Sequence, residues 1–192
     1  MTQEQFKQPP VGLEMRYTDA GDAPHLKAWL TDPTVASWFP MADSVEIEDA
    51  VNRWIAFYRY RCSLTATING VPCGIATLYL QPYRKLAHQC EFGIIVAPEF
   101  RDQGVGTDLM KNIINLAREY FKIELLHLQV YAKNPAIRLY ERFGFREFGC
   151  QTHWIKEDPK PGESDKNKKN EKIYVGRIFM ELAITPLPEA SN

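Results

Sequence analysis

The sequence predicts an α/β domain, because strand-like and helix-like segments alternate along most of the chain. Composition agrees with this prediction. Of the 192 residues, 45% are hydrophobic and 24% are charged, which is typical of a globular protein and excludes a disordered or collagen-like chain. A chain of this length can bury one sizeable core, so we expect a single domain.

Charge and apolar runs exclude several kinds of partner. The chain has 23 Lys and Arg against 24 Asp and Glu, and this formal net charge of -1 gives no global attraction to nucleic acid or acidic lipid. No stretch approaches the roughly 20 apolar residues that a membrane span needs. The first residues lack the basic run and apolar core of a signal peptide. We therefore expect a cytoplasmic monomer or homodimer with no nucleic-acid or membrane partner.

The four cysteines form neither a metal-binding nor a disulfide pattern. No two stand in a C-x-x-C pair, and no histidine stands at zinc-ligand spacing from them. We expect free thiols and no metal, with Cys90 and Cys150 as small buried apolar residues.

The first half of the chain predicts a polar, flexible arm over residues 1–12 and then the elements of an α/β fold. Asp22 before Ala23-Pro24 indicates a helix start, and Asp43 with Glu46 has the spacing of a capping box. Asn69-Gly70 between two strand-like runs is a strong hairpin signal. The expected elements are strand 13–18, helix 23–30, helix 44–58, and strands 63–68 and 71–79.

The second half predicts four more strands and two helices. Gly144 is the expected C-terminal cap of the shorter helix. Residues 156–172 are almost wholly polar and are expected to form a mobile loop between the last two strands, and 185–192 a tail. The expected elements are strand 87–96, helix 105–121, strand 125–131, helix 136–143, and strands 145–155 and 173–184.

The turn that follows strand 87–96 is the candidate for chemistry. Gly104 and Gly106 lie where a helix begins, so unpaired backbone N–H groups and the positive end of the helix dipole suit an anion such as a pyrophosphate. Arg101 can add charge-assisted hydrogen bonds. Alternatively, the two glycines serve only the backbone geometry of the turn and bind no ligand. A Rossmann fingerprint needs a third glycine where Leu109 stands, and the Gly-Lys-Ser/Thr of a P-loop is absent.

Two motifs together resemble a known family. Arg101-Asp102-Gln103-Gly104-Val105-Gly106 resembles the R/Q-x-x-G-x-G/A signature of the GCN5-related N-acetyltransferases (GNAT), and residues 136–145 resemble the family's A-I-x-L-Y-E-x-x-G-F segment. The resemblance covers about residues 13–184. It implies a mixed, twisted sheet of about seven strands with helices on both faces.

The resemblance also implies acetyl-CoA as the donor, with no metal. The backbone of the strand end would pair with the pantetheine arm like an added strand, and the turn amides would hold the pyrophosphate. Asn134 would contact the pantetheine arm, and the Tyr140 phenol would lie towards the sulfur. The implied donor-binding residues are Ile94, Ile95, Val96, Arg101, Asp102, Gln103, Gly104, Val105, Gly106, Thr107, Asn134 and Tyr140.

Two residues are candidates for proton transfer. Tyr140 resembles the family's general acid, although it could instead be a core tyrosine. Glu91 precedes the pantetheine-binding segment and is the candidate base that takes a proton from the attacking amine. Its alternative role is a strand carboxylate paired with a neighbouring cation. A backbone N–H at Ile95 or Val96 would stabilise the developing oxyanion.

The acceptor side is less defined. Trp38, Phe39 and His153 are candidate acceptor contacts, while the two aromatic residues could equally pack on the following helix. The chain departs from the family pattern at Asn134, which only Pro135 separates from Ala136. It departs again at Gln129, where similar ribosomal-protein acetyltransferases have a glutamate.

These observations predict an enzyme that moves the acetyl group of acetyl-CoA to a primary amine of a small molecule, by direct attack in a ternary complex. A polyamine, an aminoglycoside-like compound or another metabolite is the expected acceptor, because the last strand resembles that of polyamine and antibiotic acetyltransferases. Two alternatives remain open, namely an enzyme that acetylates protein N-termini or lysines, and a non-catalytic module that binds CoA.

Overall fold

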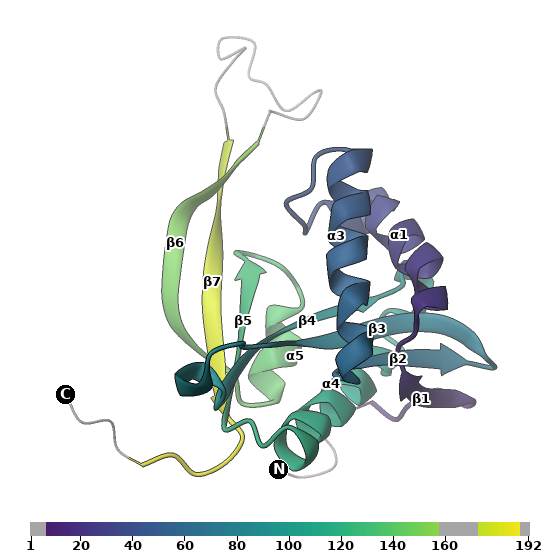
Figure 1. Cartoon of the computed structure of the whole chain (residues 1–192). Coiled ribbons are helices and arrows are strands. Elements are labelled where there is room, and N and C mark those ends of the chain that lie inside the picture. The colour runs from purple at the N-terminus through teal and green to yellow at the C-terminus, as the bar shows by residue number, and fades with distance from the viewer. Residues whose placement is uncertain (1–6, 158–172, 189–192) are drawn as a thin grey trace. The chain divides into compact units, whose positions relative to one another are not determined.

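The computed structural model describes residues 7–157 and 173–188 (Figure 1). Within these residues, seven strands form one sheet in the order β1-β2-β3-β4-β5-β7-β6. The chain divides into two compact units, one running up to His127 and including the segment from Leu182, the other comprising Leu128–Glu181. The predicted mixed α/β fold with about seven strands is confirmed.

Every predicted strand and helix is present, with shifted ends. The strands are β1 (Leu13–Tyr17), β2 (Ser63–Ile68), β3 (Val71–Leu80), β4 (Gln89–Val96), β5 (Leu125–Tyr131), β6 (Arg146–Glu157) and β7 (Ile173–Ala183). The helices are α1 (Ala23–Thr31), α2 (Pro33–Ala36), α3 (Ser44–Ala56), α4 (Val105–Asn115) and α5 (Ile137–Arg142). The single turn α2 was not predicted. It begins at Pro33 after Asp32, whose carboxylate accepts from the Thr34 amide at 2.8 Å.

Local sequence signals explain the element boundaries. Asn69 and Gly70 have φ of 51° and 80°, the positive values that a tight two-residue hairpin between β2 and β3 requires. Asp43 caps α3 by accepting from the amides of Val45 and Glu46, as predicted, although the Glu46 carboxylate returns to the Ala42 amide instead of closing a capping box on Asp43. Gly144, with φ of 92°, ends α5.

In the first unit, helices cover both faces of the sheet. The core between α1, α3 and one face includes Leu30, Trp54, Ile75 and Ile95. Gly74 points to the other face, where α4 packs against β2, β3 and β4. A Cβ atom at Gly74 would lie 2.8 Å from Leu109 Cδ1 and 2.9 Å from the Ile95 carbonyl oxygen, so the missing side chain allows α4 to approach the sheet closely.

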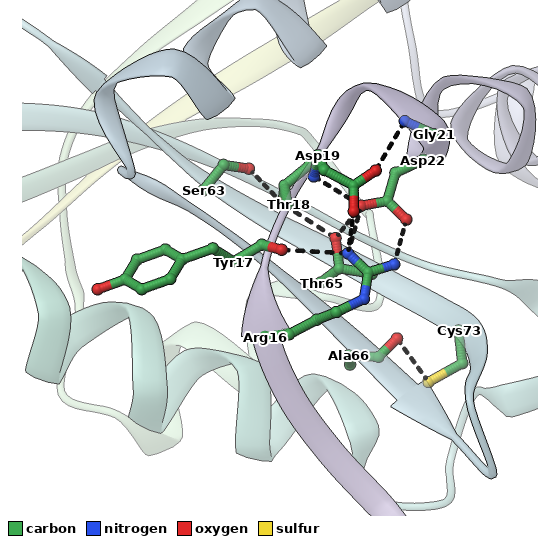
Figure 2. Close-up of polar contacts among 10 residues, drawn as sticks. All are labelled: Arg16, Tyr17, Thr18, Asp19, Gly21, Asp22, Ser63, Thr65, Ala66 and Cys73. Carbon is green, nitrogen blue, oxygen red and sulfur yellow. Dashed lines mark hydrogen bonds and ion pairs between the residues drawn. The ribbon is translucent and has the colours of Figure 1, made fainter.

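A buried polar network joins β1 and β2 to the start of α1 (Figure 2). The Arg16 guanidinium donates to both carboxylate oxygens of Asp22, at 2.8 and 2.6 Å, and Asp22 is only 1% exposed. Thr65 Oγ1 and the Asp19 amide also donate to this carboxylate, at 2.8 and 3.0 Å. Burial raises the pKa of Asp22, but these hydrogen bonds and the Arg16 charge outweigh it and hold the pKa below its ordinary value.

The second unit contains most of β5, then α5, and the long antiparallel pair of β6 and β7. The pairing register shifts between Gln151 and Ile155, which marks a bulge in β6. The expectation that Cys150 is buried is wrong. Cys150 is exposed on β6, whereas Cys62, Cys73 and Cys90 are buried in the first unit. Of the predicted loop 156–172, residues 156 and 157 end β6, and 158–172 lie outside the described residues.

Candidate active site

The turn between β4 and α4 uses the conformational freedom of Gly104 but not of Gly106, which lies in the first turn of α4. Asp102 and Gly104 both have positive φ, of 57° and 96°, which reverses the chain before α4 begins at Val105. Arg101 Nε donates to the Val96 carbonyl oxygen at 3.4 Å, and the Gln103 side chain donates to the Glu99 carbonyl oxygen at 2.7 Å. These bonds fix the turn to the end of β4.

The backbone amides of this turn have no hydrogen-bond acceptor among the described residues. Among the described residues, no amide from Asp102 to Thr107 donates a hydrogen bond to a protein acceptor, whereas the Asp108 amide donates to the Gly104 carbonyl oxygen at 3.0 Å and starts the helical pattern. Six donors at the positive end of an 11-residue helix suit an anion with several oxygen atoms. The residues present therefore fit the pyrophosphate of a nucleotide.

The N-terminal arm lies against this turn, which the sequence did not predict. The Lys7 ammonium donates to the Asp102 carbonyl oxygen at 2.7 Å. The Gln8 carbonyl oxygen lies 2.8 Å from the position that a Cβ atom on Gly104 would take. Residues 7–10 have no helical or strand structure, and residues 1–6 lie outside the described residues. The arm thus adds a positive charge beside the turn amides.

The strand β4 has an asymmetric set of neighbours. It pairs with β3 from Cys90 to Val96, but its parallel pairing with β5 ends at Glu91. Among residues 7–157 and 173–188, the strand therefore has a strand partner on one side only from Ile94 to Val96. Backbone groups on the other side can pair with an extended ligand, as the resemblance implies for the pantetheine arm.

Glu91 lies half-buried on β4, directly opposite Tyr79 on β3. Burial raises the pKa of Tyr79, and the nearby Glu91 charge raises it further, so the phenol stays protonated. A Cβ atom on Gly93 would lie 2.5 Å from Tyr79 Oη. The tyrosine therefore covers the strand beside the candidate base, and the sequence analysis did not identify it.

The aromatic pair after α2 is partly buried. Phe39 packs with its ring centroid 6.1 Å from that of Trp54 on α3, and Trp54 in turn lies 6.4 Å from Tyr79. Trp38 is half-buried. An aromatic series thus runs from Phe39 to the residue opposite Glu91.

The remaining predicted residues lie in the second unit. Tyr140 on α5 is 7% exposed, and its ring lies 6.1 Å from that of Phe145. Burial raises the pKa of Tyr140, so the phenol is neutral and can donate a proton or hydrogen bond over the physiological range.

Asn134 and His153 have local partners in the second unit. The Asn134 side-chain oxygen accepts from the Ala136 amide at 2.9 Å, which orders the start of α5. His153 is exposed, with Nδ1 3.0 Å from Thr152 Oγ1 and its ring 5.2 Å from that of Tyr174. Among the described residues, the Asn134 side-chain amide nitrogen and His153 Nε2 make no hydrogen bond.

The described residues contain neither a metal-binding cluster nor a membrane-spanning helix. Residues 7–157 and 173–188 contain no cluster of three or more His, Cys, Asp or Glu side chains arranged to hold a metal ion. Among the same residues, none of the helices has both the length and the apolar character needed to span a bilayer.

The chain combines a mixed sheet with a turn between β4 and α4 whose amides suit an anion, and this combination is typical of a class of α/β proteins that bind a phosphate-containing ligand. A sequence model described as the acetyltransferase (GNAT) family matches residues 24–145. The chain therefore belongs to the acetyltransferase (GNAT) family, and the resemblance drawn from the motifs is confirmed.

Individual relatives share shorter stretches. The chain is 31% identical over 83 residues to an L-amino acid N-acetyltransferase of Escherichia coli, covering 43% of this chain and 51% of that protein. It is 39% identical over 62 residues to an N-alpha-acetyltransferase of Sulfolobus acidocaldarius, covering 32% of this chain and 37% of that protein. The matched stretches thus span about half or less of the length of these relatives.

Solved structures share the fold over nearly the whole chain. A ribosomal-protein-alanine N-acetyltransferase from Brucella melitensis superposes with a TM-score of 0.66 at 23% identity, covering 88% of this chain and 99% of that one. The acetyltransferase yncA from Salmonella typhimurium, solved with its cofactor acetyl-CoA, superposes with a TM-score of 0.69 at 18% identity, covering 93% and 98%. At these identities the likeness shows the fold.

Proposed function

We propose that the chain transfers an acetyl group from acetyl-CoA to a primary amine of a small molecule. The observation that supports this most directly is the row of six available amides from Asp102 to Thr107, in a turn that carries the family signature. The partner-free side of Ile94 to Val96 lies on the strand that leads into this turn and suits an extended pantetheine arm.

Each candidate residue has a defined task in this proposal. Bound acetyl-CoA supplies a thioester whose acetyl group is transferred. The turn amides and Arg101 hold the pyrophosphate oxygens, and a main-chain N–H at Ile95 or Val96 stabilises negative charge on the carbonyl oxygen. Glu91 accepts a proton from the amine, directly or through a water, and the Tyr140 phenol donates a proton to the departing sulfur.

The acceptor has two candidate classes, and the relatives include both. The E. coli relative acts on L-amino acids, and the S. acidocaldarius relative is an N-alpha-acetyltransferase. We favour a small-molecule acceptor because Gln129, which has no acid–base function, stands where similar ribosomal-protein acetyltransferases have a glutamate. Protein N-termini are the second candidate.

The function is tested by two measurements on the purified chain. Calorimetry with acetyl-CoA measures donor binding, and release of free CoA with panels of amines and peptides measures transfer. Release with small amines but not peptides supports the proposal, and the reverse supports the second candidate. Tight acetyl-CoA binding without release in either panel identifies a non-catalytic module.

The donor site is tested by a matched pair of glycine substitutions. Gly104→Ala places a methyl group at a positive φ beside the bound phosphates, so we expect the Kd for acetyl-CoA to rise by about tenfold or more. Gly70→Ala imposes a similar φ strain in the β2–β3 hairpin, where a Cβ atom meets nothing within 4 Å. Gly104→Ala also brings its methyl group 2.8 Å from the Gln8 carbonyl oxygen, so the control matches the φ strain but not this contact. Gly70→Ala should lower the melting temperature and leave the Kd unchanged. Equal Kd values for both variants would contradict the proposed site.

A further inference from the structure

The second unit contains an arginine that the proposed mechanism does not use. Arg177 lies on β7, which the sheet order places between β5 and β6. Its Nε donates to Oε1 of Gln151 on β6 at 3.1 Å, and its Nη1 donates to Oε1 of Gln129 on β5. The guanidinium is thus held from both neighbouring strands.

Two aromatic rings lie against the same guanidinium. Its central carbon is 4.7 Å from the centroid of the Trp154 ring and 4.6 Å from that of Phe179. Trp154 also packs on Tyr131, with ring centroids 5.2 Å apart, and it lies within the β6 bulge. Rings on a cation exclude water and strengthen its interaction with a further charged group. The arginine is therefore ordered and partly desolvated before any ligand binds.

The charge of Arg177 has no acidic partner within residues 7–157 and 173–188. The ion pairs of this part of the chain involve other arginines and lysines, and the two groups that hold Arg177 are neutral amides. A guanidinium has five N–H donors, and these two hydrogen bonds use two of them. With respect to the described residues, three donors and a full positive charge therefore remain for a planar anion.

We infer that Arg177 binds a carboxylate of the acceptor, so that the acceptor is a small molecule with both a primary amine and a carboxylate, as in an amino acid. This inference rests on the proposed function. A carboxylate matches the planar guanidinium in shape and accepts two parallel hydrogen bonds from it. The phosphates of the donor have their own cations, Arg101 and Lys7, beside the turn amides of the first unit. Arg177 is thus left for the acceptor in this proposal.

Gln129 has a positioning role in this arrangement. It directs the Arg177 fork without neutralising it. A glutamate at the same position would form an ion pair with Arg177 and compete with the ligand carboxylate. Gln129→Glu therefore changes charge at nearly constant shape and gives a test that does not remove the arginine.

The test compares amino acids with their α-amides, which keep the amine and lose the carboxylate. The probes are glycine, L-alanine, L-leucine, L-phenylalanine and L-lysine, each with its amide, and CoA release gives kcat and KM. For the wild-type chain we expect kcat/KM to favour the acid over its amide by at least about tenfold, the effect of one charge-assisted pair. In Arg177→Gln and Gln129→Glu this ratio should fall to near one through a higher KM for the acid. Arg146→Gln removes an exposed charge from β6 and should keep the wild-type ratio.

Three results would overturn the inference. The first is a wild-type enzyme that acetylates amines with no preference for the acid, which contradicts the carboxylate site while leaving the proposed function standing. The second is a preference that survives Arg177→Gln in a folded variant. The third is an Arg177→Gln variant that binds CoA more weakly but 3′-dephospho-CoA normally, which assigns the charge to the donor. If no probe is turned over, calorimetry of the CoA-bound chain with N-acetyl-L-alanine and its amide decides, and equal or absent binding of the two rejects the inference.

Discussion

At the scale of single residues, the two proposed proton carriers differ in their surroundings. Tyr140 is buried and its pKa is raised, so it remains a proton donor at every pH at which the chain would be assayed. Glu91 is half-buried and lies opposite a tyrosine that burial also keeps protonated. The proposed mechanism assigns the proton donor to the neutral phenol and the proton acceptor to the half-buried carboxylate.

Substitution of Tyr140 should lower kcat, whereas substitution of Glu91 should change the pH dependence of kcat/KM. Tyr140→Phe removes only the phenol oxygen, and we expect kcat to fall by roughly 10²-fold while the Kd for acetyl-CoA stays constant. Glu91→Gln should flatten the rise of kcat/KM with pH. Stopped-flow or steady-state CoA release measures both. Wild-type kcat in Tyr140→Phe would show that the phenol serves packing alone.

The lowered pKa of Asp22 predicts how the free energy of unfolding depends on pH. Its pKa is lowered in the fold, so the stabilisation is complete above the ordinary carboxyl pKa of about 4 and is lost as pH falls through the lower native value. Asp22→Asn removes the negative charge and replaces one of the two accepting oxygens by an NH2 donor, so part of the bonding from Arg16 and Thr65 is lost. We expect the free energy of unfolding at pH 7 to fall by about 2 kcal/mol. Urea unfolding between pH 7 and pH 3 measures both effects.

The control for this prediction is the exposed pair of Arg53 and Asp49 on α3. Asp49→Asn should change stability little at any pH, because exposed ion pairs contribute little. If Asp22→Asn and the wild-type chain lose the same stability between pH 7 and pH 3, the network is not the source of the acid sensitivity.

At the scale of elements, the N-terminal arm lies against the turn that is proposed to bind the donor. Lys7 places an ammonium group on the Asp102 carbonyl, beside the amides proposed to hold pyrophosphate. Lys7→Ala should raise the Kd for acetyl-CoA by about two- to fivefold at low salt, and by less at high salt, because an exposed cation is screened. Lys85→Ala removes an exposed lysine from the 3₁₀ turn after β3 and should leave the Kd unchanged. A Lys7 variant with wild-type affinity at low salt would exclude the arm from the donor site.

Elements were predictable from sequence wherever a local signal sets them. Asn69-Gly70 requires positive φ at both residues, and the apolar spacing of α4 gives one helical face, so both were predicted correctly. The turn α2 depends on Asp32 and Pro33 alone, and no periodicity accompanies so short an element. The exposure of Cys150 depends on which face of β6 is covered, and residue type does not determine that.

The candidate site also has one part that local sequence predicts and one part that it does not. The turn amides follow from the local sequence, since two glycines at a strand-to-helix junction define them. The contacts of Lys7 with Asp102 and of Arg177 with Gln129 join residues 95 and 48 positions apart. Such contacts depend on the complete fold, and nothing in the spacing of these residues indicates them.

At the scale of the whole molecule, thiol chemistry should distinguish the folded chain from the unfolded one. Burial raises the pKa of Cys62 and Cys73 to about 11 and that of Cys90 to about 12, so they hold almost no thiolate near pH 8. Only Cys150 is exposed among the four. Brief iodoacetamide treatment followed by mass spectrometry should find one modified cysteine in the native chain and four in guanidinium.

Cys150→Ser provides the control, because the native variant should then remain unmodified. Rapid modification of a second cysteine in the native chain would contradict the burial of the first unit's core. The same variant would remove the protein's own background from any assay that detects released CoA by its thiol.

The close contact at Gly74 lies between β3 and α4, the helix whose first amides belong to the proposed donor site, so we expect this contact to influence donor affinity. The amides at the start of this helix have positions set by how deeply Leu109 settles onto β3, and only a hydrogen atom at residue 74 separates the two. A methyl group in Gly74→Ala would push α4 away from the sheet. Calorimetry should then show weaker acetyl-CoA binding, although every residue proposed to contact the phosphates is unchanged. The distance between α4 and the sheet is thus one structural variable that we expect to set the affinity for acetyl-CoA.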